Sequence, residues 1–201
     1  VIDKENLTIT ENLSRRQRYA VFGDMKLEYM GILAVGITGR NDWTSTLPKN
    51  ARTFYSPSYS GSFTYSELFE NKDKWYGKLR ISYAKVGKDA PIYRTNTNLV
   101  QVNTVGGGFV TSATGGNPDL GPERTQEFEL GTELSFFKRR LNVDLTYYER
   151  KSLDMIMTPR VPLPSGYVIM TFNAGSLRNR GVEMSLSGTP VKTNSFSWTA
   201  T

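Results

Sequence analysis

The feature that most constrains this chain is a run with a strict period of two that follows a rigid turn. Residues 117–123 read Asn-Pro-Asp-Leu-Gly-Pro-Glu, and two prolines together with Asp119 and Gly121 are typical of tight turns. From Thr125 to Phe136 apolar and polar side chains then alternate. The apolar face consists of Phe128, Leu130, Thr132, Leu134 and Phe136. Since the other face is polar and largely acidic, this alternation predicts a β-strand between two different environments.

A second alternating run follows the segment Phe137–Arg140. Its apolar face consists of Leu141, Val143, Leu145 and Tyr147. Two such runs joined by a few residues predict an antiparallel hairpin. If the turn centres on Lys138 and Arg139, the register sets Leu130 opposite Tyr147.

The same register brings charged side chains together on the polar face of the hairpin. Glu127 comes opposite Arg150, which is a favourable pair. Glu133 comes opposite Asp144, and two like charges at this spacing need a cation between them. The preceding strand offers one lysine and one arginine on its polar face, and we expect one of them to bridge to these carboxylates. The expected network consists of Lys78, Arg80, Glu127, Glu129, Glu133, Asp144 and Arg150.

Alternation recurs along the rest of the chain and predicts about eight strands of roughly 9–13 residues, close to the roughly 9–11 that cross a bilayer at a tilt. Short and long connections between these strands alternate. The short ones are expected at residues 30–31, 66–74, 137–140 and 188–194, and the longer ones at 44–52, 88–123 and 152–178. In transmembrane barrels short turns and long loops lie on opposite sides of the membrane. Residues 1–17 have no clean period and look like the end of a surface loop.

Composition gives no sign of a membrane protein, because the mean hydropathy is −0.43. No apolar run approaches the roughly 20 residues of a transmembrane helix. A transmembrane barrel also has low mean hydropathy, since every second residue faces a wet interior. The alternation therefore favours a barrel wall, and a soluble β-sandwich with long loops is the alternative.

Several classes of function are disfavoured by what the chain contains. It has neither cysteine nor histidine, so it lacks thiols and the commonest general base and metal ligand. Glu127, Glu129 and Glu133 could form a catalytic or cation-binding cluster, but their spacing places them in a polar row of the inner wall. The lysines and arginines behind the net charge of +6 are scattered, which disfavours nucleic-acid binding. We predict no enzymatic activity, no cofactor and no metal site.

Four sequence motifs give evidence that is independent of the alternation of apolar and polar residues. The segment from Asn117 to Gly131 is similar to "NPxLxPE(R/K)T…E.G", and Gly39–Trp43 is similar to "GRxDxSS". Lys78–Lys88 resembles "LKLRxSYGxxGN", with an alanine and a lysine in place of the usual glycine and asparagine, and Asn179–Glu183 matches "N(K/R)GVE". In this order and spacing the motifs resemble the SusC/RagA-like family of TonB-dependent outer-membrane transporters.

The resemblance implies an all-β fold, an antiparallel transmembrane β-barrel wall with long extracellular loops and short periplasmic turns. The barrel of the family has about 22 strands around a plug domain. We therefore expect residues 1–201 to be an internal part of the barrel domain, without the plug domain and the C-terminal strands. The expected location is the outer membrane of a Gram-negative cell, which the chain would cross several times.

The resemblance also implies partners and a transport function. These are a SusD-like surface lipoprotein, TonB through the plug and N-terminal region, the lipid bilayer with its lipopolysaccharide, and an oligosaccharide or peptide substrate. Candidate extracellular contacts to a ligand or to the lipoprotein are Trp43, Tyr93, Arg94 and Tyr167. The alternatives are a passive porin or structural outer-membrane barrel, and a soluble carbohydrate-binding β-sandwich.

Overall fold

A computed structural model describes residues 13–69, 74–102, 107–193 and 195–201 of the chain. Its main element is an eight-stranded sheet with the order β1-β2-β3-β4-β8-β9-β11-β12, in which neighbouring strands are antiparallel. These strands are β1 (Arg18–Tyr29), β2 (Leu33–Thr44), β3 (Thr53–Phe63), β4 (Trp75–Lys88), β8 (Glu123–Phe136), β9 (Leu141–Met157), β11 (Phe172–Lys192) and β12 (Ser197–Ala200). The predicted all-β fold of about eight strands is confirmed.

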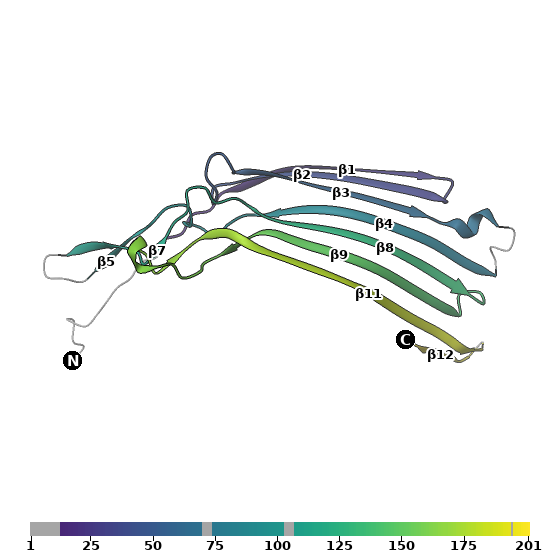
Figure 1. Ribbon diagram of the computed structural model, residues 1–201. Coiled ribbons are helices and arrows are strands. Elements are labelled where there is room, and N and C mark those ends of the chain that lie inside the picture. Colours follow the sequence, from purple (N-terminus) through teal and green to yellow (C-terminus); the bar gives the residue numbers. More distant parts are fainter. Residues whose placement is uncertain (1–12, 70–73, 103–106, 194) are drawn as a thin grey trace, which may run out of the picture.

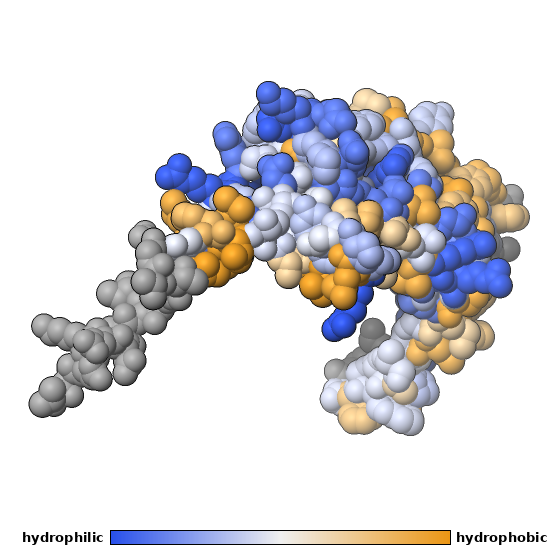
Figure 2. Space-filling view, turned by 60° about the vertical axis from the view of Figure 1, so that its left-hand side comes forward, coloured by the Kyte–Doolittle hydropathy of each residue, from blue (hydrophilic) through white to orange (hydrophobic). Residues whose placement is uncertain are grey.

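The sheet forms an open arc and not a closed cylinder. The long strands lie side by side along the molecule in Figure 1, and Figure 2 shows the molecule arched around a hollow that is open below. The edge strands of the described sheet are β1 and β12. No described helix is long and apolar enough to cross a membrane.

The two faces of the arc differ because the alternation stays in register from strand to strand. One row on the convex face is built of successive register partners and runs through Met25, Ile37, Tyr59, Tyr83 and Phe128. The neighbouring row on the concave face runs through Lys26, Gly36, Ser60, Ser82, Glu129 and Tyr148. Many apolar side chains of the convex face are exposed, among them Val21 at 67% and Met184 at 70%. An exposed apolar surface of this extent needs lipid or another apolar partner.

Successive connections lie at opposite ends of the sheet. Residues 30–32 and 137–140 form two of the connections at one end, and the connection from β3 to β4 at the same end contains the 3₁₀ turn η2 (Tyr65–Leu68). In Figure 1 these connections lie at the right-hand end of the strands, and those that follow β2, β4 and β9 at the left. The predicted alternation holds for the turns at residues 30–32 and 137–140 and for the two longest loops. It was wrong for one pair of connections, because the one from β3 to β4 (residues 64–74) is longer than the one from β2 to β3 (residues 45–52). Of the expected N-terminal loop at residues 1–17, residues 1–12 lie outside the part that the structure describes.

The predicted loop at residues 88–123 contains strands, so its description as a plain loop was wrong. Within it, β5 (Leu99–Val102) pairs with β6 (Gly108–Thr111), and β7 (Thr114–Gly115) pairs with β10 (Ile169–Met170) of the next loop. These strands are only two to four residues long. So few residues leave no readable period, and their pairing depends on contacts that are distant in sequence.

The predicted bounds of the second long loop, 152–178, were also wrong. β9 and β11 extend into this range from both sides, so the loop is shorter than predicted. Register shifts between Asn173 and Leu177 interrupt the pairing of β11 with β9 and hide the period-two pattern there. The remaining loop contains the 3₁₀ turn η3 (Leu163–Ser165). At its other end β11 continues past the predicted turn at residue 188. A register shift between Gly188 and Val191 brackets Pro190, which has no N–H for the ladder.

A small core lies at the loop end of the sheet. It consists of Leu47, Phe54, Ala90 and Leu120, which are almost fully buried. Two buried carboxylates accompany it. Asp42 accepts hydrogen bonds from Arg18 and Arg40, and Asp89 accepts from Arg16, Thr44 and Thr46. The Asp89 contacts join the end of β2 and its following loop to the residue after β4, and the Asp42 contacts join β1 to β2. Charge pairs therefore stabilise the loop end in addition to apolar packing.

Candidate functional site

The β8–β9 hairpin has the register that the sequence predicts. Leu130 is the partner of Tyr147, Glu127 of Arg150, and Glu133 of Asp144. The turn occupies residues 137–140, where the Arg140 amide donates to the Phe136 carbonyl oxygen over 3.0 Å. The like-charged pair Glu133–Asp144 therefore exists on the concave face.

Arg80 lies between these two carboxylates and pairs with both. Its Nη1 lies 2.9 Å from Glu133 Oε1, and its Nη2 lies 2.8 Å from Asp144 Oδ2. Thr146, next to Asp144 on the same face, donates a hydrogen bond of 3.2 Å to Asp144 Oδ1. The guanidinium has enough donors to serve two carboxylates at once, which an ammonium does with less fixed geometry. Of the two candidate cations, Arg80 makes the expected bridge between the carboxylates. Lys78 lies directly opposite Glu133 in the register of β4 and β8.

The rest of the predicted network lies further toward the loop end on the same face. Arg150 Nη2 donates to Glu127 Oε2 over 2.9 Å, and Ser82 donates to Glu129 over 3.3 Å. All these side chains are partly exposed, so each pair contributes little to stability by itself. Together they fix the positions of charges along the concave wall.

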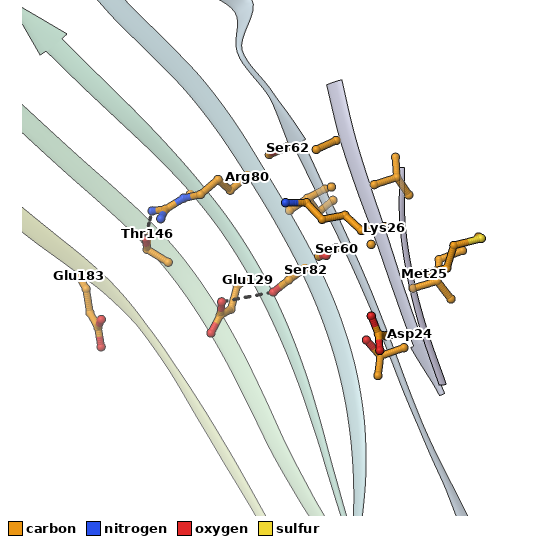
Figure 3. A pocket seen from close by; sticks show the side chains of 18 residues that line it. Asp24, Met25, Lys26, Ser60, Ser62, Arg80, Ser82, Glu129, Thr146 and Glu183 are labelled. Carbon is orange, nitrogen blue, oxygen red and sulfur yellow. Dashed lines mark hydrogen bonds between the residues drawn. The ribbon is translucent and has the colours of Figure 1, made fainter. Parts of the chain in front are cut away.

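The network borders a broad hollow in the concave face, about 630 Å³ in volume. Its lining comes from seven strands. Figure 3 shows Asp24 and Lys26 on β1, and Arg80, Glu129 and Glu183 on β4, β8 and β11. Both signs of charge are present with serine and threonine hydroxyls between them. Such a surface can hold polar or charged groups of another molecule or domain. Within the described residues no three His, Cys, Asp or Glu side chains group to hold a metal ion.

Nearly the whole chain matches one protein family. Residues 3–201 match the family model described as "TonB dependent receptor-like, beta-barrel". The chain belongs to the TonB-dependent receptor family.

Curated relatives and solved structures agree with this assignment. The chain is 32% identical to TonB-dependent receptor P26 of Formosa agariphila, over 96% of this chain and 20% of the relative. It is 26% identical to TonB-dependent receptor SusC of Bacteroides thetaiotaomicron, over 94% of this chain and 20% of SusC. It thus spans about one fifth of these relatives.

Among solved structures the chain is similar to the RagAB peptide importer in its "closed-closed" state. The TM-score is 0.85 at 26% identity, over 96% of this chain and 22% of that chain. The siderophore receptor PirA from Pseudomonas aeruginosa matches with a TM-score of 0.63 at 21% identity, over 92% of this chain and 33% of that chain. PirA therefore supports the fold alone. The open sheet is part of a TonB-dependent receptor barrel, and the predicted resemblance to SusC and RagA is confirmed.

In this receptor wall the four candidate extracellular residues do not form one site. Trp43 lies on the convex face, where its ring stacks on Tyr19 with centroids 5.1 Å apart. Tyr93 and Arg94 line a small hollow of about 270 Å³ in the loop cluster. The Tyr167 hydroxyl accepts a hydrogen bond from Thr97 over 3.3 Å in the same cluster. Trp43 therefore has the position of an interfacial aromatic, whereas contacts through the other three stay a prediction.

Sequence reasoning missed two features of the receptor wall. The first is the pair of buried carboxylates at the loop end, which depends on a fold between distant segments and gives no local signal. The second is a charged cluster on the convex face of β9 and β11. Continued alternation beyond Tyr147 would have placed Glu149 and Lys151 on the apolar face, so a signal for it was present in the sequence.

Proposed function

We propose that this chain is part of the barrel wall of an active importer in the outer membrane of a Gram-negative bacterium. The observation that carries the proposal is the wall itself, a sheet with an apolar convex face and a charged concave face. Its likeness to the RagAB peptide importer extends over 96% of the chain. An apolar outside and a polar inside suit a barrel in lipid that encloses water or a plug.

In the full-length protein a plug domain would fill the barrel, further strands would close it, and TonB would supply the energy. The relatives are about five times as long as this chain, which leaves room for these parts. The concave network around Arg80 would stabilise the wall and contact the plug, because its fixed charges of both signs can pair with polar groups of a second domain. In this proposal its role is positioning and not chemistry.

The proposed partner on the cell surface is a SusD-like lipoprotein, and the proposed cargo is an oligosaccharide or a peptide. Support comes from the similarity to SusC and to the RagAB peptide importer. Tyr93, Arg94 and Tyr167 lie in the loop cluster where a surface partner or a cargo could be contacted.

The test is uptake by cells that produce the full-length protein, with and without a functional TonB. Labelled oligosaccharides and labelled peptides are offered separately, and accumulation is measured. We expect accumulation of one class that disappears without TonB. Uptake that persists without TonB would indicate a passive porin, and recovery of the protein in the soluble fraction would indicate a β-sandwich.

A further inference from the structure

Charged side chains gather on the convex face of β9 and β11, directly beyond its apolar surface. The two oxygens of the Glu149 carboxylate lie 2.7 Å from Arg178 Nη2 and 2.9 Å from Lys151 Nζ. Arg180 is the register partner of Glu149. We call Glu149, Lys151, Arg178 and Arg180 the basic cluster, because it contains three cations and one carboxylate.

The orientation of the basic cluster follows from its neighbours on the concave face. Glu183 and Thr146 line the hollow of Figure 3, and Tyr148 lies against Gly181, where a Cβ atom would come within 2.9 Å of the tyrosine hydroxyl. Successive side chains of a strand point to opposite faces. The cluster residues alternate with these and therefore point outward, and the ion pairs of Glu149 with Lys151 and Arg178 require this common side.

The height of the basic cluster matches the edge of a membrane. Below it on the convex face the register pairs are Tyr147–Val182, Leu145–Met184 and Val143–Leu186, all apolar. The stretch from Leu141 to Lys151 spans about 33 Å at about 3.3 Å per residue, or about 25 Å along the barrel axis at a tilt of about 40°. The apolar band of outer-membrane barrels is about 25 Å tall. The cluster thus lies where hydrocarbon gives way to headgroups on the loop side.

The basic cluster carries more positive charge than its single carboxylate balances. A charge on the lipid-facing surface is costly at the middle of the bilayer and nearly neutral at the interface, so the position is tolerated. One carboxylate, however, cannot neutralise Lys151, Arg178 and Arg180 together. Lys85 adds a further cation, because the register runs from Lys85 through Gln126 to Lys151 and Arg178. The excess is positive and reaches across four strands.

We propose that the basic cluster binds the phosphate groups of a phosphorylated glycolipid headgroup in the outer leaflet. The guanidinium groups of Arg178 and Arg180, both on β11, can each donate two hydrogen bonds to a phosphate. Val182, which is 66% exposed just below the cluster on the same face, offers apolar contact to the lipid. This inference rests on the proposed function, because the outer membrane is where such a lipid would lie beside the wall.

The test measures lipid binding to the purified full-length receptor in detergent by native mass spectrometry. The probes are bisphosphorylated lipid A and the same lipid with both phosphates removed. The test variant is Arg178→Gln/Arg180→Gln. The matched control is Lys138→Gln/Arg139→Gln, which removes two positive charges at the opposite end of the same sheet. Heat-modifiable migration on gels confirms that every variant is folded.

We expect the affinity for bisphosphorylated lipid A to fall on the order of tenfold in the test variant and to stay unchanged in the control. Arg178→Lys/Arg180→Lys should retain most of the affinity. Equal binding of the dephosphorylated lipid, or an equal loss in the control, would overturn the proposal. Displacement of the lipid by millimolar inorganic phosphate would indicate a simple anion site instead. Since binding is measured on purified protein, a failure of TonB-dependent uptake leaves this result readable on its own.

Discussion

Arg80 controls the charge balance of the concave wall, because it is the cation shared by Glu133 and Asp144. Arg80→Met should leave these two carboxylates facing each other without a partner. Since all three side chains are about one-third exposed, we expect a loss of about 1 kcal/mol in the free energy of unfolding. Guanidinium denaturation of the full-length receptor in detergent measures it. Arg150→Met, which breaks a single pair with Glu127, is the control and should cost less.

A second substitution separates charge from packing at this position. If the loss arises from repulsion between the carboxylates, Asp144→Asn should restore stability in the Arg80→Met background and reduce it in the wild type. Equal effects of Asp144→Asn in both backgrounds would contradict the charge argument.

Asp89 gives the loop end a dependence on pH. Burial raises the pKa of its carboxyl, but hydrogen bonds from Thr44 and Arg16 lower it more, so the pKa lies below its ordinary value of 3.8. Because the pKa of Asp89 is lower in the folded than in the unfolded protein, its carboxylate stabilises the folded loop end fully above about pH 4. This stabilisation is lost as pH falls through the native pKa. We expect amides at 44–47 to lose hydrogen-exchange protection in acid, after correction for intrinsic rates.

The matched variant is Asp89→Asn, which keeps the size of the side chain and removes its charge. It should lower protection of the same amides by about 2 kcal/mol at neutral pH and abolish the loss in acid. An acid loss that survives in Asp89→Asn would assign the pH dependence to another group.

At the scale of the single element, the turn between β8 and β9 is strained. Phe137, Lys138 and Arg139 have φ angles of 54°, 57° and 62°, a left-handed conformation that disfavours residues with a Cβ atom. Lys138→Gly should relieve this at the middle position and stabilise the receptor by up to about 1 kcal/mol. Lys138→Ala, which keeps the Cβ atom, is the control. A destabilised glycine variant would show that the Lys138 side chain contributes more than the backbone gains.

The predictability of each element depended on whether its period-two pattern was intact. β1 has the bounds that alternation predicts, Arg18–Tyr29, because its two faces meet different surroundings along its whole length. β11 begins before its predicted start, because bulges near Gly175 interrupt the pattern. A cation bridge at Glu133 and Asp144 was predictable from register, because two facing carboxylates need a cation between them. Register left Lys78 and Arg80 open as that cation, and the side-chain geometry selects Arg80. The carboxylates of the loop end were not, because their partners come from distant segments.

At the scale of the whole molecule, we predict that these residues do not fold alone. Each edge strand of the described sheet, β1 and β12, leaves backbone N–H and C=O groups unpaired on one side, which a bilayer does not tolerate. The isolated chain, refolded into detergent, should aggregate or stay unfolded in gel-shift and circular-dichroism measurements. The full-length receptor, treated in the same way, is the control. A heat-modifiable monomer of the isolated chain would contradict this expectation.

The small number of buried apolar side chains has a consequence for how the wall responds to its surroundings. Among the described residues four apolar side chains are almost fully buried, all at the loop end, while the convex surface of the strands is exposed. In the proposed outer-membrane setting the acyl chains of the bilayer would cover this surface and take the place of a hydrophobic interior. The stability of the wall should vary with the hydrocarbon thickness of the host membrane and be greatest where that thickness matches the apolar band. A change in acyl-chain length would then change the stability of the wall, as a core substitution changes the stability of a water-soluble domain.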